Sequence, residues 1–167
     1  MAAELDSAQP TPLSKQLLPL LKWPWELVIL LGLLAWLYRQ TMPPGISSWI
    51  IEGWDSAVLQ ITGSTWGIPH SPGYPLYTML ANIFVRLTGV IPELTDTSVV
   101  WRVSFWSTFT SLLTLMFVYL TARLLTRNRA VAVIAAGLLG ISFVFWRAAI
   151  MAEVYSLNAL STIIKKG

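Results

Sequence analysis

Two long apolar runs separated by a short basic turn constrain the fold of this chain more than any other feature of its sequence. The runs cover residues 99–125 and 130–147, and the turn between them has the sequence TRNR. Because a helix needs roughly 20 predominantly apolar residues to cross a bilayer, both runs are predicted to be membrane helices. The composition agrees, since hydrophobic residues make up 55% of the chain and charged residues only 11%.

Two further spans are predicted, one near each end of the chain. The first covers about 23–40 and follows a polar tail at 1–22, and the last covers about 153–165. No small-residue cleavage site follows the first apolar run, which indicates an uncleaved span. Lys15 and Lys22 precede it and favour a cytoplasmic amino terminus. The predicted fold class is therefore all-α: a multi-pass helical protein of the cell membrane, with residues 23–167 as its membrane domain.

The topology depends on whether a short apolar segment at 74–87, which carries Arg86, crosses the membrane. If it crosses, the arginines around the TRNR turn fall outside, against the rule that basic loops stay in the cytoplasm. We therefore interpret the segment as a juxtamembrane or half-inserted helix, with a full crossing as the open alternative. Residues 41–97 then form one external loop with a short helix at 56–65, and Glu153 emerges on the same external side.

The composition also limits the partners and sites of the chain. It has no cysteine, so it can form neither disulfides nor thiolate metal sites. Its net charge of +3 is too small and too scattered for a nucleic-acid groove. Nine Trp and five Tyr suit the aromatic belts at the two faces of a membrane. The partner that the composition predicts is the lipid bilayer.

Two acidic motifs lie beside apolar segments. The first, WDSAVLQITGSTWGIPHSPGYPL, contains Asp55 and His70, which is the only histidine in the sequence. The second, MAEVYSL, contains Glu153 and follows about a hundred residues later. Acidic residues at the edge of a membrane segment are costly and need a reason. Since both acids fall on the external side in the preferred topology, they suggest a catalytic site.

These motifs also carry a family resemblance. Asp55 stands fifteen positions before His70 in GIPHSPGYPLY, and FWRAAIMAEVYSLNAL follows after an Arg-led span. The pattern, over roughly 54–159, resembles the transmembrane protein 260-type family of O-mannosyltransferase-like membrane proteins. More remotely it resembles the GT-C glycosyltransferases that use lipid-linked sugars. Family members usually continue much further, so the resemblance implies the amino-terminal part of a GT-C-type fold, and we expect a fragment rather than a complete enzyme.

One position departs from the family pattern. The first motif usually reads Asp-Ser-Gly-Glu in the family, whereas this chain has Asp55, Ser56, Ala57 and Val58. The second carboxylate is therefore missing. A divalent cation is possible but is not supported by this motif, so we predict no metal ligand and leave the cofactor unknown.

The resemblance implies transfer of a sugar such as mannose from a polyprenyl-phosphate donor to an unidentified hydroxyl acceptor on the extracytoplasmic side. Such a transfer needs a base for the acceptor hydroxyl. Asp55 is the predicted catalytic base, although Asp is also a favoured cap for the helix at 56–65. Glu153 is the second catalytic candidate. It could orient the acceptor or hold a cation with Asp55, or it could simply end a span at the headgroup level.

Five further residues are predicted to bind substrate. Arg102 and Arg147 suit the leaving phosphate because Arg binds phosphate in a bidentate way, but either could equally be an interfacial anchor. His70 is a candidate donor to sugar or phosphate, with a structural hydrogen bond as its alternative. Trp66 and Tyr74 could line a sugar site, although aromatic residues at an interface need no such role.

Two other functions stay open at this point. A non-catalytic membrane scaffold or assembly protein derived from the family is favoured by Val58 and by the short chain. A transporter fragment would use Asp55 and Glu153 to line a substrate path. Transporter sites lie near the middle of the bilayer, whereas both acids here lie at the edges of spans, so this reading ranks last.

Overall fold

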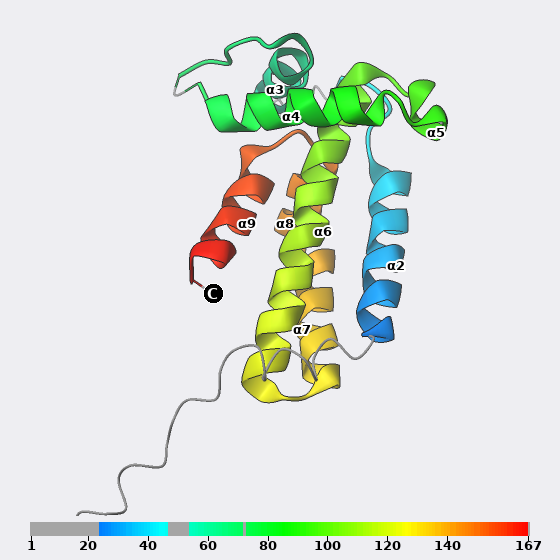
Figure 1. The fold of residues 1–167 in the computed structure, drawn as a ribbon, viewed down its shortest axis with the longest axis vertical. Helices are drawn as coiled ribbons and strands as arrows, with labels where there is room; N and C mark the ends of the chain where they lie inside the picture. The colour runs from blue at the N-terminus through cyan, green and yellow to red at the C-terminus, as the bar shows by residue number, and fades with distance from the viewer. Residues whose placement is uncertain (1–23, 47–53, 72, 167) are drawn as a thin grey trace, which may run out of the picture.

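The computed structural model describes residues 24–46, 54–71 and 73–166, and the predicted polar tail lies outside them. Within these residues the chain is all-helical, as the sequence predicts (Figure 1). The helices are α2 (Trp25–Thr41), α3 (Trp54–Thr65), α4 (Pro75–Thr88), α5 (Pro92–Thr95), α6 (Val99–Thr126), α7 (Arg129–Ile141), α8 (Phe143–Ile150) and α9 (Val154–Lys166).

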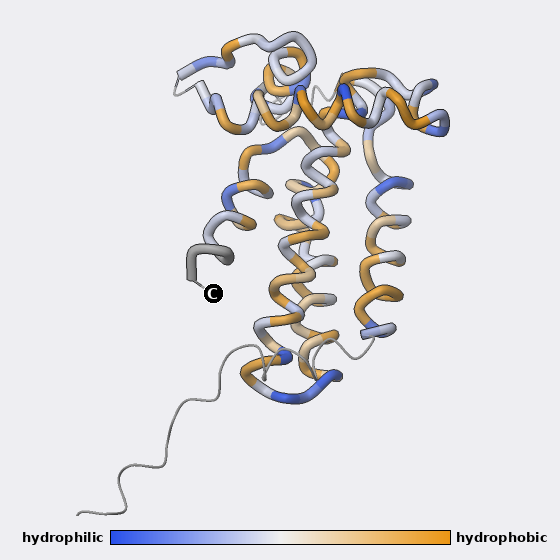
Figure 2. Tube along the Cα trace, in the orientation of Figure 1, coloured by the Kyte–Doolittle hydropathy of each residue, from blue (hydrophilic) through white to orange (hydrophobic). Residues whose placement is uncertain are grey.

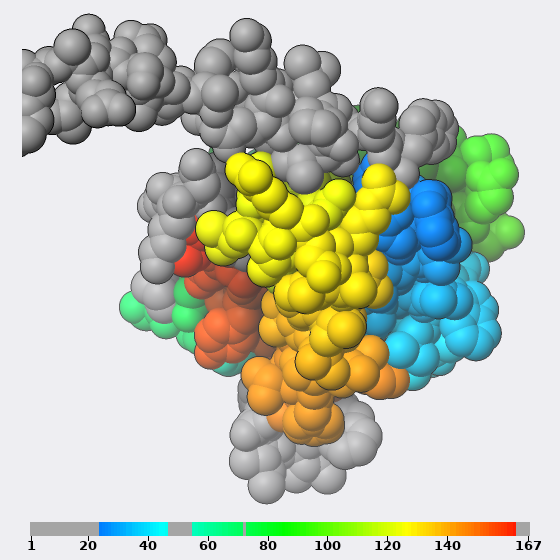
Figure 3. Space-filling view, turned by 90° about the horizontal axis from the view of Figure 1, so that it is seen from below, coloured from blue at the N-terminus to red at the C-terminus, as the bar shows by residue number. Residues whose placement is uncertain are grey.

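The helices form a bundle and an upper layer. In Figure 1 the bundle helices α2, α6, α7 and α9 run roughly along the long axis, α8 lies behind α6 at a bend of 66° from α7, and α3, α4 and α5 lie across one end. Seen from below, α2 and α9 lie on opposite sides of the α7 and α8 atoms (Figure 3). The helix predicted at 74–87 is therefore α4, which lies across the end of α6. Its position relative to a bilayer remains a prediction.

The basic turn between the two apolar runs is a tight helix-to-helix connection. Arg127 ends α6 in the left-handed conformation, with a φ of 52°, and its N–H donates to the carbonyl of Arg123. The Asn128 side chain then caps α7 by accepting from the N–H of Ala130 at 2.9 Å. Figure 2 shows this turn as the hydrophilic lower end of the bundle.

Small hydroxyl side chains cover the buried face of α6. Thr108 Oγ1 donates to the carbonyl of Ala149 in α8 at 2.7 Å. Thr110 Oγ1 donates to Ser156 Oγ in α9 at 3.0 Å. Small and hydroxyl residues let apolar helices approach closely, which explains how α8 and α9 both pack on α6.

The prediction of one helix over 130–147 is wrong, because the segment is broken at Ser142. This residue is extended, with a φ of −64° and a ψ of 136°, and α7 and α8 meet there at a bend of 66°. An extended residue stops the helical hydrogen-bond pattern and leaves nearby carbonyls in need of donors. Tyr38 from α2 supplies one, since its hydroxyl donates to the carbonyl of Gly140 at 2.6 Å. All residues near the break are apolar or small, so the sequence pattern gives no signal for it.

One helix among the described residues, α6, is long and apolar enough to cross a membrane. The bent pair α7 and α8 makes a second candidate if the two helices form one broken span. The helices at the other predicted spans, α2 and α9, are shorter, with 17 and 13 residues. The multi-pass arrangement with four spans therefore belongs to the proposals below.

Candidate functional site

The two polar residues of the first motif form a pair at the start of α3. The capping alternative required Asp55 to lie just before the helix. The helix begins at Trp54, so Asp55 lies in its first turn instead. Asp55 Oδ1 lies 2.9 Å from Nε2 of His70, which is carried by the loop between α3 and α4. The other ring nitrogen of His70, Nδ1, lies 3.0 Å from the carbonyl oxygen of Ser71.

These contacts favour a charged histidine. Both ring nitrogens face oxygen acceptors, and only the protonated imidazole has a hydrogen to donate to each. The hydrogen bonds to the Ser71 carbonyl and to Asp55 raise the pKa of His70. The Asp55 and His70 side chains are 61% and 48% exposed, so the pair is open to a ligand.

The second motif is joined by one hydrogen bond to the first motif and by another to α6. The N–H of Ala152 donates to Ser56 Oγ at 3.0 Å, and the N–H of Glu153 donates to Ser107 Oγ of α6 at 3.1 Å. Ser56 is adjacent to Asp55 in α3. The backbone beside Glu153 is thereby fixed at the same end of the bundle as Asp55, which brings together two acids almost a hundred residues apart.

Glu153 lies half-buried at the entrance to α9, near a buried tyrosine of the upper layer. The Tyr77 hydroxyl lies 3.1 Å from Ser107 Oγ. Burial raises the pKa of Tyr77 well above its usual range, and the negative charge of Glu153 raises it further. The carboxylate of Glu153 is therefore close enough for its field to act on a hydroxyl that stays protonated.

The loop between α3 and α4 has an unusual backbone. Trp66 and Tyr74 have positive φ angles of 60° and 38°, and Gly73 has a φ of 90°. A non-glycine residue in this region costs on the order of 1–3 kcal/mol, and such residues cluster at ligand sites. At Trp66 the conformation ends α3, because the N–H of Gly67 then reaches the carbonyl of Thr62 at 2.9 Å.

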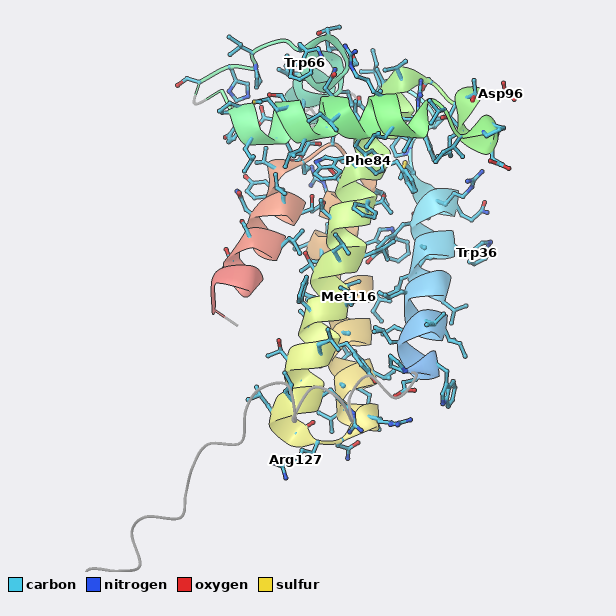
Figure 4. All side chains as sticks on the ribbon, viewed as in Figure 1. Trp36, Trp66, Phe84, Asp96, Met116 and Arg127 are labelled. Carbon is cyan, nitrogen blue, oxygen red and sulfur yellow. The ribbon has the colours of Figure 1, made fainter. Side chains whose placement is uncertain are left out.

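A half-open pocket of about 310 Å³ lies on this loop. It is lined by Trp66, Gly67, Ile68, Gly73, Pro75, Thr78 and Met79. Trp66 thus lines a pocket, as the sequence suggested, and Figure 4 shows it in the upper layer. Tyr74 is not among the lining residues, but its ring meets the His70 ring edge-on with centroids 6.3 Å apart. One loop therefore forms the pocket wall and carries His70.

A polar chain on α4 that the sequence analysis missed supports the same loop. Asn82 Nδ2 donates to the carbonyls of Gly63 and Ser64 at the end of α3, at 2.9 and 3.0 Å. Its Oδ1 accepts from Nε of Arg86 at 2.8 Å. The Arg86 guanidinium carbon lies 5.8 Å from the centre of the Trp66 ring. Only the spacing of Asn82 and Arg86, one helical turn apart, could have signalled this pairing.

The two predicted phosphate ligands come from α6 and α8. Arg102 Nη1 donates to the carbonyl of Val85 at 3.2 Å, near the carboxyl end of α4. This carbonyl is about 15 Å along the helix from Pro75, at a rise of about 1.5 Å per residue. Arg147 is half-buried in the last turn of α8. Within the described residues no contact joins Arg102 to the Asp55–His70 pair, and the phosphate roles of Arg102 and Arg147 remain predictions.

A third acid that the sequence analysis did not single out lies at the opposite end of the bundle. Glu26 Oε1 accepts from the Tyr119 hydroxyl at 2.8 Å and lies 3.5 Å from Nε of Arg129. These contacts join α2 to α6 and α7. Within the described residues, no three His, Asp or Glu side chains gather closely enough to hold a metal ion, so this part of the chain points to no metal ligand set.

Comparison with known proteins identifies the family. The model of the protein O-mannosyl-transferase TMEM260 N-terminal domain matches residues 55–165, which include both acidic motifs. The protein O-mannosyl-transferase tmem260 of Dictyostelium discoideum is 34% identical over 122 residues, or 73% of this chain and 14% of that protein. The mouse protein O-mannosyl-transferase TMEM260 is 32% identical over 110 residues, or 66% of this chain and 15% of that protein.

The family match covers the site, but this chain spans only about a seventh of the length of these relatives. No solved structure matches the chain. The matched region contains Asp55, His70 and Glu153, the residues that the fold gathers at one end of the bundle. On the family model and on both relatives, the chain belongs to the protein O-mannosyl-transferase TMEM260 family.

Proposed function

We propose that this chain forms the amino-terminal part of a membrane glycosyltransferase. The enzyme would transfer a sugar such as mannose from a polyprenyl-phosphate donor to a hydroxyl acceptor on the extracytoplasmic side. The names of the relatives support a mannosyl-transferase role. The observation that supports the proposal best is the hydrogen bond from Ala152 to Ser56, because it joins the residue before Glu153 to the residue after Asp55.

In this mechanism Asp55 is the catalytic base. One carboxylate oxygen, Oδ1, is held by His70. The other, Oδ2, makes no hydrogen bond within the described residues and is available to the acceptor. Oδ2 takes the proton of the acceptor hydroxyl, whose oxygen forms a bond to the anomeric carbon of the sugar. The bond from that carbon to the phosphate oxygen breaks, and the polyprenyl phosphate leaves with the electron pair.

His70 and Glu153 have supporting roles in the proposal. A protonated His70 keeps Oδ1 fixed and places a positive charge where the negatively charged donor would approach. Glu153, next to the protonated Tyr77 hydroxyl, orients the acceptor from the opposite side. Trp66 supplies a flat wall of the pocket, a surface of the kind on which a sugar ring packs.

The proposed topology places this site outside the cell or in the lumen. Spans at α2, α6, the broken pair α7–α8, and α9 put the amino terminus and the TRNR turn in the cytoplasm. The upper layer is then external, with α4 at the interface. A cysteine introduced at Asn128 should react with an impermeant thiol reagent only after permeabilisation, whereas one at Asp96 should react in intact cells. Labelling at Asn128 in intact cells would overturn this topology.

The catalytic assignment is tested by Asp55→Asn in a full-length chain completed with the downstream region of a relative. Asn caps a helix nearly as well as Asp and keeps the shape of the side chain, but it cannot accept the proton. Loss of general-base catalysis costs about 10²–10⁴ in rate. We expect Asp55→Asn to insert normally in the membrane and its turnover to fall by that factor. Val58→Glu is the control and should keep both insertion and turnover. If Asp55→Asn keeps more than about a tenth of the activity, it lies outside the general-base range and Asp55 is not the base.

One observation favours a second candidate function, a non-catalytic scaffold derived from the family. Val58 lies on α3 one turn after Asp55, where the family pattern has an acid. A scaffold would leave the completed chain without transferase activity whatever residue stands at 55. The same measurement on the unsubstituted full-length chain therefore separates the two functions.

A further inference from the structure

Arg86 is an exposed arginine that the fold nevertheless holds in place. Its Nε donates to Asn82, and its guanidinium lies over the Trp66 ring. Asn82 is itself only 2% exposed and is fixed by the Gly63 and Ser64 carbonyls. Ordering a long side chain costs conformational entropy. A surface arginine that is already ordered is therefore prepared to bind a ligand without that cost.

The remaining donors of Arg86 are available. Arginine has five N–H donors, and in the described part of the chain only the one on Nε is hydrogen-bonded. Trp66, which Arg86 covers, lines the pocket together with Met79. Met79 and Arg86 are seven residues apart on α4, so they share one face about two turns apart. The free donors thus lie at the margin of the pocket.

An apolar row runs along the same helix. Leu76, Met79, Ile83 and Leu87 are 62%, 49%, 44% and 64% exposed, and their spacing places them on one face of α4. One of them, Met79, also lines the pocket. The pocket, the guanidinium and the apolar row together match a ligand with a small polar head, a phosphate and a hydrocarbon chain.

We propose that Arg86 binds the phosphate of an isoprenyl-phosphate ligand, with the hydrocarbon chain along the apolar row of α4. The ligand class rests on the proposed function, and the residue is new to it. Arg102, the candidate from the sequence, uses Nη1 on the carbonyl of Val85, the residue before Arg86 in α4. Arg86 has the planar fork that suits phosphate, and its guanidinium covers Trp66, which lines the pocket.

The test is the affinity of the 167-residue chain in detergent for citronellyl phosphate, a short isoprenyl monophosphate, measured by calorimetry. A hydrogen bond to a charged group contributes about 1.5–3 kcal/mol, so Arg86→Gln should weaken binding by about tenfold to a hundredfold. Arg127→Gln removes the same charge at the opposite end of the molecule (Figure 4) and should leave the affinity within about twofold. Arg86→Lys keeps the charge but loses the planar guanidinium, so its affinity should lie between those of Arg86→Gln and Arg127→Gln.

Two further ligands identify what is bound. Citronellol, which lacks the phosphate, should bind Arg86→Gln and the unsubstituted chain equally, and inorganic phosphate should bind more weakly than citronellyl phosphate. Equal affinities for the two phosphates would overturn the isoprenyl assignment in favour of a free-phosphate site. An unchanged affinity in Arg86→Gln, or an equal loss in Arg127→Gln, would overturn the role of Arg86.

The binding experiment can be interpreted whether or not the completed chain transfers sugar. Binding that depends on Arg86 in a chain whose completed form transfers no sugar would refute the proposed enzyme and leave the phosphate site standing. Sugar transfer by the completed chain that does not depend on Arg86 would support the proposed enzyme and refute the role of Arg86. If Arg86→Gln proves unfolded by circular dichroism, Arg86→Lys decides, since an affinity equal to that of the unsubstituted chain would refute the proposal.

Discussion

Two carboxylates at opposite ends of the molecule have opposite environments. The Glu26 side chain is 11% exposed and receives a hydrogen bond from Tyr119 beside Arg129, whereas the Asp55 side chain is 61% exposed and is hydrogen-bonded to His70. Glu26 joins three helices, and Asp55 joins a helix end to a loop. The comparison separates an acid that the fold needs from one that the fold merely positions, and only the second has an oxygen open to a substrate.

The largest expected effect tests this contrast directly with a matched pair of substitutions. Glu26→Ala removes a hydrogen bond to a charged group, so we expect a loss of about 1.5–3 kcal/mol in the free energy of unfolding. Asp55→Ala removes an exposed pair, whose contribution is typically about 0–1 kcal/mol. Thermal unfolding of both variants in the same detergent, followed by circular dichroism, measures the difference. A larger loss for Asp55→Ala would reverse the assignment of the two acids.

A smaller effect is expected at the joint between the upper layer and the bundle. Ser107→Ala removes the acceptor of the Glu153 N–H and the partner of the Tyr77 hydroxyl, so we expect a loss of about 1 kcal/mol in the free energy of unfolding. Ser111 lies one turn further along α6, and its buried hydroxyl has no hydrogen-bond partner among the residues that the structure describes. Ser111→Ala is therefore the matched control and should be neutral. Equal melting temperatures for the two variants would show that the joint does not depend on Ser107.

The smallest effect is a change in one proton equilibrium. His70 is the only histidine in the sequence, so its ring resonance gives its pKa by NMR without ambiguity. We expect a pKa above the usual value of about 6.5. Asp55→Asn should lower it, and the Ser71 carbonyl should keep part of the elevation.

The same shift gives the sign of the pH dependence. Because the folded chain binds the proton more tightly than the unfolded chain, the stabilisation from His70 is complete below a pH of about 6.5 and is lost as the pH rises through the folded pKa. Stability that instead rises over this range in the unsubstituted chain, but not in His70→Gln, would contradict the Asp55–His70 pair.

The sequence predicted the elements better than their contacts. Hydrophobic runs and their ends placed α2, α6 and α9 to within about two residues, the usual uncertainty of helix ends. The same pattern could not show the break at Ser142. The break frees the carbonyl of Gly140, and the hydroxyl that bonds it comes from Tyr38 in α2. Packing across the chain, rather than local composition, determines that feature.

The site shows the same division. Residue type and motif order drew attention to Asp55, His70 and Glu153, and the fold gathers them. Arg102 was chosen because it lies near the end of a span, and nothing in the sequence indicates that its Nη1 donates to a carbonyl of α4. The hydrogen bond from Ala152 to Ser56 joins residues 96 positions apart and has no signature in a single sequence.

The way in which α9 begins has a consequence for how the chain assembles. The first backbone N–H groups of a helix usually find acceptors in the residues just before it. Here the N–H groups of Ala152 and Glu153, at the entrance to α9, are received by hydroxyls of α3 and α6. Both acceptors lie earlier in the chain, so a ribosome completes them before α9 emerges. We therefore expect α9 to dock after α3 and α6 during synthesis, on a surface already formed, so that the turn bearing Glu153 takes its shape only once the Asp55 end exists.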